Sequence, residues 1–257
     1  MAVLEKLLAA VTDGRVEVID LTAPLQGSTP ILLLPEPFAN TRPFRLEEIS
    51  RYDERGPGWY WNDISTGEHT GTHFDAPVHW VTAQDGEDVA QVPARRLIAP
   101  AAVLDFTAEA TADPDFLLEI EHVRGWEKEH GPLPEGGWLL YRTGWDRRSD
   151  DQADFLNAGE DGPHTPGVSV GCARWLAEEA PVIGVGVETV GTDAGAAHSF
   201  DPAFPCHSYL LGAGKYGLTQ LRNLASLPPT GAVVLAAPLP IVGGSGSPAR
   251  VLALVER

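Results

Sequence analysis

The sequence predicts a mixed fold, α/β or α+β, because strand patterns outnumber helical patterns and the two kinds do not strictly alternate. The 257 residues are 43% hydrophobic, enough to bury one large core, and no stretch is long enough to link two separate domains. The 27 glycines and 22 prolines are scattered, as in a chain with many short turns. We therefore expect residues 1–257 to form one domain around a mixed sheet.

In the first half, an apolar pattern that includes Glu5 and Lys6 predicts an amphipathic helix at the start of the chain. Alternating or short apolar runs predict strands, and residues 46–53 have the spacing of a short helix. The predicted elements are helices at 1–11 and 46–53, strands at 16–21 and 101–106, and a strand or curved loop at 69–80.

In the second half, a helix is predicted where Leu117, Ile120, Val123 and Trp126 recur at helical spacing. The glycine-rich apolar run at 182–187 predicts a buried strand. The predicted elements are helices at 116–129, 169–179 and 218–224, and strands at 138–143, 182–187, 232–237 and 251–255.

The charge of the chain argues against a nucleic-acid partner. The formal net charge is −18 and the isoelectric point is near 4.7, whereas phosphate recognition needs clustered Lys and Arg. No secretion signal is evident, and the longest apolar run, residues 232–242, is too short for a membrane span and contains Pro238 and Pro240. We expect a soluble cytoplasmic protein that binds neither nucleic acid nor membranes.

The segment from Glu68 to Trp80 carries the strongest chemical signal, because His69, His73, Asp75 and His79 all have odd numbers. In an extended strand these four side chains would share one face, and the other face would be free to pack into a core. A helix would also bring histidines four positions apart together, as in some zinc enzymes, but the glycine and proline of this segment disfavour a helix.

The spacing predicts a metal site. At roughly 3.3 Å per residue, His73 and Asp75 lie about 7 Å apart and can converge on one ion, whereas His69 would lie about 13 Å from His73 in a straight strand. The backbone must therefore bend, and Gly71 can turn it without steric penalty. Two imidazoles and a carboxylate suit Zn²⁺, Mn²⁺ or Fe²⁺ and leave positions open for water or substrate. His79 should lie near the ion but poorly placed to complete its coordination, which makes it the candidate general base.

Three other patterns predict no chemistry. Cys172 and Cys206 are expected to be free thiols, and the side chains of Cys206 and His207 would point to opposite faces of a strand. The GxGxxG match at 212–217 has no acidic residue about 20 positions further on. Residues 243–247 resemble a nucleophile elbow without its second glycine, and a tight turn before the last strand explains them better.

With the pattern HxGTHxDxPxH at residues 69–79, the chain resembles the metal-dependent cyclase or kynurenine-formamidase-like hydrolase superfamily. Further similar segments span nearly the whole chain. They are Ile19–Thr22, Pro205–His207 with Leu210–Leu211, Leu224–Pro228, Ala237–Leu239 and Gly243–Arg250.

The resemblance implies a swivelling β/β/α domain, a homodimer or higher homo-oligomer, a divalent metal, and hydrolysis of a small amide or lactam. It carries the ligand role to His69, His73 and Asp75 and the proton-transfer role to His79. His207 would be a second-site ligand or an active-site partner. Dinuclear formamidases have a glutamate ligand twelve residues after that histidine, and here the matching residue is Thr219, which disfavours a second metal.

A mononuclear site with Phe74, Trp80 and the run 216–220 is similar to that of the isatin hydrolase branch of the family. This resemblance implies Mn²⁺ as the metal, with Zn²⁺ as the alternative. It also implies that metal-activated water opens a cyclic amide. Trp59, Trp61 and Trp80 are candidates for a flat apolar substrate pocket, although tryptophans at this density also fit a core. Two alternatives stay open: an N-formylkynurenine formamidase, and a metal-dependent ligand-binding protein without turnover. A base at His79 would have no role in such a binding protein.

Overall fold

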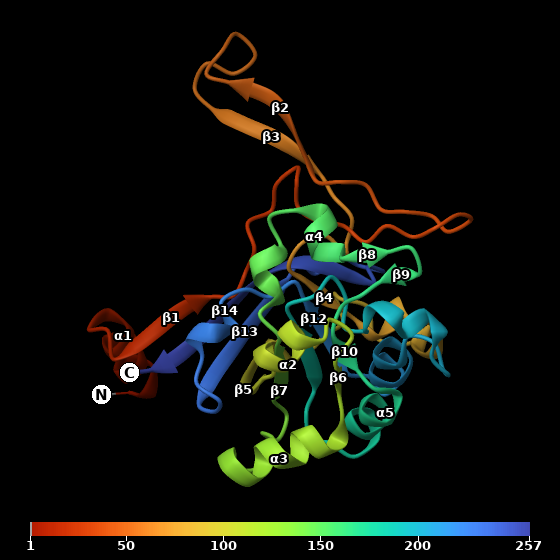
Figure 1. Ribbon diagram of the computed structural model, residues 1–257. Helices are drawn as coiled ribbons and strands as arrows, with labels where there is room; N and C mark the ends of the chain where they lie inside the picture. Colours follow the sequence, from red (N-terminus) through yellow and green to blue (C-terminus); the bar gives the residue numbers. More distant parts are fainter. Residues whose placement is uncertain (1) are drawn as a thin grey trace.

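Seven strands close into a ring in the computed structural model of the protein, which describes residues 2–257 (Figure 1). The ring runs β14–β13–β5–β7–β11–β12–β4 and closes because the start of β14 pairs with β4. The strands of the ring are β4 (His73–Asp75), β5 (Ile98–Asp105), β7 (Trp138–Arg142), β11 (Gly184–Val187), β12 (Tyr216–Thr219), β13 (Ala232–Pro238) and β14 (Gly246–Glu256). β1 (Val16–Asp20) pairs with the far end of β14 and lies outside the ring.

The four strands β5, β7, β11 and β12 run parallel, and β4, β13 and β14 are antiparallel to their neighbours. The remaining strands are short pairs: β2 (Arg45–Arg51) with β3 (Tyr60–Ser65), β6 (Leu117–Leu118) with β10 (Gly167–Val168), and β8 (Ala158–Gly159) with β9 (Gly162–Pro163). The predicted mixed sheet is confirmed.

The helices are α1 (Val3–Thr12), α2 (Thr107–Ala112), α3 (Ile120–His130), α4 (Gln152–Leu156) and α5 (Val170–Glu178). Short 3₁₀ turns lie at Pro77–His79, Val81–Ala83, Ala94–Leu97, Trp145–Arg148, Gly195–Ser199 and Leu224–Ser226, and a π-helical turn lies at Cys206–Leu211. The helix predicted at 169–179 is confirmed as α5, which begins after Ser169, whose hydroxyl accepts the N–H of Cys172 as an N-cap. Within residues 2–257, no helix is long and apolar enough to cross a membrane.

The sheet is buried on both faces, as β7 illustrates. Trp138 and Leu140 belong to the cluster inside the ring, while Leu139 and Tyr141 pack in a second cluster with residues of α3 and α5. Strands that are covered on both sides carry continuous apolar runs rather than alternation. This explains why residues 138–143 and 182–187 were recognisable from their apolar character alone.

Two predicted helices are wrong. Residues 46–53 form the strand β2 and its turn, paired with β3, because the cross-strand pairs Leu46–Ile64 and Arg51–Tyr60 determine the structure there rather than the local spacing. Of residues 218–224, the first two form the end of β12. The next residue, Gln220, has a backbone φ of +51°, a left-handed conformation that interrupts any helix.

Candidate metal centre

The predicted segment is a strand only over the three residues of β4, which pair with β12 on one side and β14 on the other. The expected two-faced arrangement is present there. Phe74 is fully buried in the cluster inside the ring, while His73 and Asp75 point to the other face and are also almost completely buried. On either side of β4 the backbone turns, and these turns position the other two histidines.

The turn before β4 brings His69 to Asp75. Gly71 has φ +65°, the left-handed conformation that glycine adopts without penalty, so the predicted bend at this residue is confirmed. A Cβ at this position would also lie 3.1 Å from Leu25 Cδ1. As a result, His69 Nδ1 lies 2.8 Å from Asp75 Oδ1, although the two residues are six positions apart.

The turn after β4 places His79 closer than a strand would. Pro77 begins a 3₁₀ turn over Pro77–His79, and the His79 ring stacks on the His69 ring with centroids 3.8 Å apart. His69, Asp75 and His79 each offer a ligand atom, and these atoms all lie within 4.8 Å of one another. His79 therefore lies closer to Asp75 than an extended backbone would place it, because the chain turns after Asp75.

His73 contacts the same carboxylate oxygen as His69. Its Nε2 lies 3.3 Å from Asp75 Oδ1, and its ring meets the His69 ring at right angles. Thr219, the residue at the position of the formamidase glutamate, faces His73 in the β4–β12 register and brings its hydroxyl within 3.0 Å of both ring nitrogens. At this position the chain offers a hydroxyl and no carboxylate.

Hydrogen bonds to the outer nitrogens turn a lone pair of each ring toward Asp75. The Ser245 hydroxyl donates to Glu68 Oε2 at 2.6 Å, so its oxygen accepts the Nε2–H of His69 at 2.8 Å. His73 Nδ1–H donates to the Gly71 carbonyl at 2.7 Å. When both rings are neutral, they therefore present unprotonated nitrogens to a buried carboxylate oxygen. Three acceptors that face one another at these distances need a proton or a metal cation between them.

Two glycines make room for this cluster. Asp75 is in register with Gly217 on β12 and with Gly246 on β14. A Cβ on Gly217 would lie 2.6 Å from Asp75 Oδ2, and one on Gly246 would lie 2.7 Å from His69 Cε1. Neighbouring strands thus leave space for the carboxylate and the imidazole in the closed sheet.

Electrostatics keep Asp75 ionised and His79 neutral. Burial alone would raise the pKa of Asp75, but positive charge on His73 and a hydrogen bond from a protonated His69 hold this pKa well below its usual range. Burial, together with the charges of His69 and His207, lowers the pKa of His79 to about 3 despite the opposing effect of Asp75. The ring nitrogens of His79 have no hydrogen-bond partner among residues 2–257, so they are available for exchange of a proton.

His207 lies at the edge of the same group. It belongs to the π-helical turn, and its ring centroid is 5.4 Å from that of His79. Its Nδ1 lies 2.5 Å from Asp193 Oδ2, and although burial lowers the pKa of His207, the hydrogen bond and charge of Asp193 raise it above its usual value. Cys206 next to it is fully buried with a raised thiol pKa, and both cysteines are free, as predicted.

Of the three candidate pocket tryptophans, only Trp80 lies at the site. Its ring centroid is 4.8 Å from that of His207, and its Nε1–H donates to Ser208 Oγ. Trp59 and Trp61 are about half exposed on the β2–β3 hairpin, which projects away from the ring (Figure 1). The structure does not bring Trp59 and Trp61 to the cluster around Asp75, because the hairpin that carries them extends away from it.

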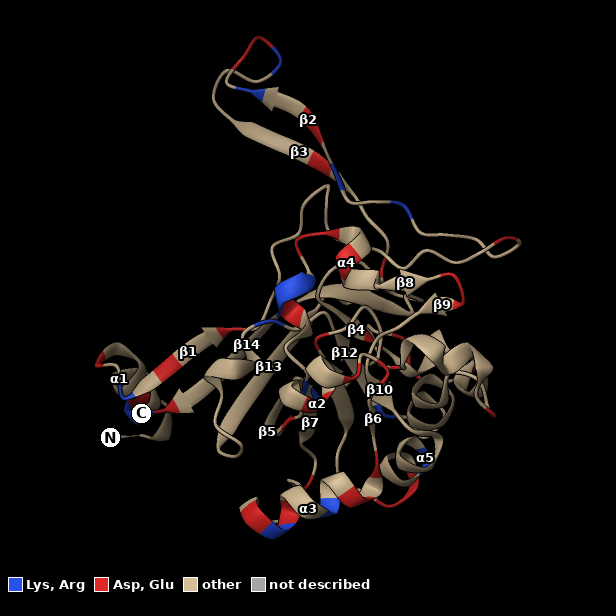
Figure 2. Ribbon diagram, viewed as in Figure 1, with Lys and Arg blue, Asp and Glu red and all other residues tan. Residues whose placement is uncertain are grey.

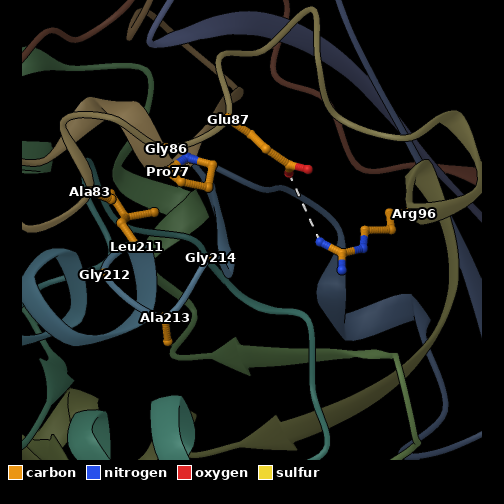
Figure 3. A pocket seen from close by; sticks show the side chains of 9 residues that line it. All are labelled: Pro77, Ala83, Gly86, Glu87, Arg96, Leu211, Gly212, Ala213 and Gly214. Atoms are coloured by element: carbon orange, nitrogen blue, oxygen red, sulfur yellow. Dashed lines mark ion pairs between the residues drawn. The ribbon is translucent and has the colours of Figure 1, made fainter.

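A cavity of about 390 Å³ opens near Pro77 and the glycine-rich turn at 212–214, but no site histidine lines it (Figure 3). Its charged groups are Glu87 and Arg96, which lie 4.0 Å apart. Both also hydrogen-bond the Tyr216 hydroxyl. This cavity is separate from the cluster around Asp75.

Sequence reasoning missed Ser245 and Asp193, and it noted Thr219 only as a departure from a family pattern. Ser245 reaches His69 across 176 positions and Thr219 reaches His73 across 146. Asp193 lies 14 positions before His207, at no recognisable spacing. No local signal points to these contacts, since strand pairing and loop packing create them.

Comparison with known proteins agrees with this geometry. The model of a family described as putative cyclase matches residues 19–194. An isatin hydrolase of Roseibium aggregatum is 46% identical over 99% of this chain and 97% of its own length, and a kynurenine formamidase of Salinibacter ruber is 28% identical over 72% of this chain and 74% of its own.

The solved structures agree as well. Isatin hydrolase A from Ralstonia solanacearum superposes with a TM-score of 0.97 at 50% identity, covering 100% of this chain and 98% of that one. An isatin hydrolase bound to the product analogue thioisatinate also gives 0.97, at 45% identity, with both chains fully covered. The chain belongs to the cyclase family, and isatin hydrolases are among its relatives.

Proposed function

We propose that this protein is a metal-dependent hydrolase that opens an isatin-like lactam. The observation that carries the proposal is the convergence of two imidazole lone pairs on the buried Asp75 carboxylate, an arrangement that calls for a cation. The full-length similarity to isatin hydrolases supports the substrate class, a cyclic amide fused to an aromatic ring. Hydrolysis would break the amide C–N bond and yield a carboxylate and an aryl amine.

We propose His69, His73 and Asp75 as the residues that hold the metal. Two imidazoles and one carboxylate fit Mn²⁺, Zn²⁺ and Fe²⁺, and we favour Mn²⁺ with Zn²⁺ as the alternative on the resemblance to the isatin hydrolase branch. A divalent cation there would supply a Lewis acid that polarises the amide carbonyl and acidifies water. Thr219 offers no carboxylate for a second ion, which supports a single-metal site.

His79 is the proposed proton carrier. Its lowered pKa keeps the ring neutral near pH 7, and no protein group competes for its nitrogens among residues 2–257. His79 would accept the proton of the attacking water and return it to the departing amide nitrogen. No serine or cysteine nucleophile is needed, in keeping with the burial of both thiols.

His207 is the proposed partner of the oxyanion. Asp193 accepts its Nδ1–H and favours the protonated ring, which leaves Nε2–H as a donor for the oxygen that gains charge during attack. A single donor of this kind is typically worth ~3 kcal/mol of transition-state stabilisation. Trp80, packed against His207, would form one apolar wall of the substrate pocket.

The test compares two substrates on one preparation with a known metal content. We expect isatin to be opened and N-formylkynurenine to be a poor substrate, measured by chromatography of the products at equal concentrations. Preferential deformylation would instead support the formamidase function of relatives such as that of Salinibacter ruber. Isatin that stays bound and uncleaved over hours would point to a binder without turnover.

A further inference from the structure

Phe204 has a backbone conformation that a phenylalanine rarely adopts. Its φ is +52°, a value that suits glycine but that brings a Cβ close to the following carbonyl. The next residue is Pro205, and a residue before proline normally favours extended backbone. Such strain persists only where the surrounding structure imposes it, and it clusters at functional sites. Phe204 lies three residues before His207, so the strain lies beside the proposed active site.

Hydrogen bonds hold Phe204 in this conformation from both sides. Its N–H donates to the Ala197 carbonyl at 3.0 Å, and its carbonyl accepts the Ser208 N–H at 2.9 Å. Residues 202–214 contain no Asp, Glu, Lys or Arg, and this part of the ribbon is tan in Figure 2. Apart from His207, the segment therefore depends on hydrogen bonds and ring packing for its position.

The same segment holds Trp80 through three contacts. The Phe204 ring meets the Trp80 ring edge to face, with centroids 5.6 Å apart and planes at 66°. Ser208 Oγ accepts the Trp80 Nε1–H at 3.1 Å and donates to the Ala203 carbonyl at 3.0 Å. The third contact is the His207 ring. An edge contact on the ring and a hydrogen bond at its nitrogen together determine how the indole plane is oriented.

The Trp80 ring is close to both histidines that have a proposed role in the reaction. Its centroid is 4.8 Å from that of His207 and 6.3 Å from that of His79, and among residues 2–257 the aromatic rings in contact with Trp80 are these two and Phe204. A flat substrate that packs on the indole takes its tilt from the indole. A small change of tilt would keep the apolar contact but misplace the reacting carbonyl, and a misplacement of about 1 Å can cost about 100-fold in rate.

We propose that Phe204 is a positioning residue for this reaction. Its left-handed backbone and its ring fix the Trp80 plane so that a flat lactam lies with its carbonyl at His207 and its nitrogen at His79. The role rests on the proposed function, and Phe204 acts through Trp80 rather than on the substrate. Loss of the Phe204 ring should therefore lower kcat more than it raises KM, whereas loss of a residue that only fills space would affect stability alone.

The first experiment tests the backbone conformation by urea unfolding. Glycine adopts a positive φ freely, whereas alanine does not. We expect Phe204→Gly to have a higher urea midpoint than Phe204→Ala. Phe200, four residues earlier, has φ −79° and is the matched control, where the alanine variant should have the higher midpoint. If Phe204→Ala were the more stable of its pair, the strained conformation would be overturned.

The second experiment measures isatin opening by Phe204→Leu, which keeps an apolar side chain but removes the ring. We expect kcat to fall at least about tenfold while KM stays within about threefold of the wild-type value, because alignment is lost and the apolar contact is kept. The matched control is Phe200→Leu, which should keep kcat within about twofold. Unchanged kcat in Phe204→Leu, or an equal fall in both variants, would overturn the positioning role.

A double-variant cycle shows whether Phe204 acts through Trp80. In the Trp80→Leu background the indole is gone, so Phe204→Leu should lower kcat by less than about threefold further. A further tenfold loss in that background would mean that Phe204 acts independently of Trp80, and it would overturn the proposal.

The failure of this role and the failure of the proposed function are distinguishable. Wild-type protein that opens no isatin would refute the proposed function, and with it the role of Phe204, while the order of the urea midpoints would stand. Equal kinetics of the Phe204 and Phe200 variants in a protein that does open isatin would refute the positioning role alone.

Discussion

At the scale of single residues, the central feature is a carboxylate that faces two imidazoles from their lone-pair sides. Ser245 and the Gly71 carbonyl hold the outer N–H groups of His69 and His73, so neither ring, when neutral, offers a proton to Asp75. Buried acceptors at such distances repel one another unless a cation neutralises them. Substitution of Asp75 and substitution of His79 should therefore have different effects on the metal content of the protein, and this difference distinguishes their roles.

Asp75→Asn should abolish stoichiometric metal binding and with it all turnover, because the amide lacks the charge that compensates the cation. His79→Ala should retain one metal ion per chain and lose most of kcat, because it removes the proposed proton carrier. Metal analysis after gel filtration, together with steady-state kinetics, checks both variants. If His79→Ala emptied the site and its residual activity followed occupancy, His79 would be a ligand rather than the base.

Ser245→Ala should weaken metal binding although Ser245 is no ligand. Without its hydroxyl oxygen, the Nε2–H of His69 loses its partner, and loss of such an outer contact typically reduces metal affinity by about 10- to 100-fold. Competition with a coloured chelator measures the change. Ser199→Ala is the control, since the Ser199 hydroxyl bonds only the nearby Ala196 carbonyl; an equal effect of both variants would refute the role of Ser245.

At the scale of elements, the register of β4 with its two neighbours decides whether the site can exist. Asp75 has a glycine opposite it on each side, and any side chain there would push the carboxylate away from the histidines. The strand is only three residues long, so it cannot shift to relieve such a contact without losing its pairing.

Gly217→Ala should therefore damage metal affinity more than it damages the fold. Its Cβ would lie 2.6 Å from Asp75 Oδ2, and the carboxylate must move by several tenths of an ångström. We expect at least a tenfold weaker metal affinity, by titration. Gly171→Ala on α5, where a Cβ meets no atom within 4 Å, should leave affinity unchanged. Unaltered affinity in Gly217→Ala would show that the position of Asp75 is not limiting.

Glu188, directly after β11, predicts a pH dependence of stability. Burial and the nearby Asp146 raise the pKa of this carboxyl to about 7, although its Oε2 accepts N–H groups from Thr143, Gly144 and Trp145. Because this pKa lies above the unfolded value of 4.5, folding takes up a proton between these pH values. The stabilisation is complete below pH 4.5 and is lost as pH rises toward 7.

The Glu188→Gln variant should lack this component. From pH 4.5 to 8, the wild type should lose up to about 3 kcal/mol more unfolding free energy than the variant, since one pKa unit corresponds to about 1.4 kcal/mol. Urea unfolding of the metal-free proteins at several pH values provides the measurement. Parallel curves for the two proteins would mean that Glu188 is ionised in the folded state throughout.

A helix or strand can be predicted from the sequence when the residues that determine it are close to one another in the chain. The buried strands β7 and β11 and the capped helix α5 have local signals in apolar runs and in Ser169. The β2 strand and the end of β12 were mistaken for helices because their structure depends on distant partners. The same applies to the site, where the motif and its bend were evident but the 3₁₀ turn at His79 and the contacts of Ser245 were not.

At the scale of the whole molecule, the closed ring explains how a short strand can carry the chemistry. β4 completes the ring between β12 and β14, so residues from three distant parts of the sequence meet at Asp75. A cation that binds only the folded protein would also stabilise the ring as a whole, in proportion to the logarithm of its free concentration. Fold, metal content and activity should therefore change together.

The most direct test of the central claim is metal removal followed by reconstitution, with isatin opening measured on the same samples. The protein stripped by chelation, with its metal content verified as zero, should have no activity, and one equivalent of Mn²⁺ per chain should restore it. Full isatin opening by verified metal-free protein would contradict the account.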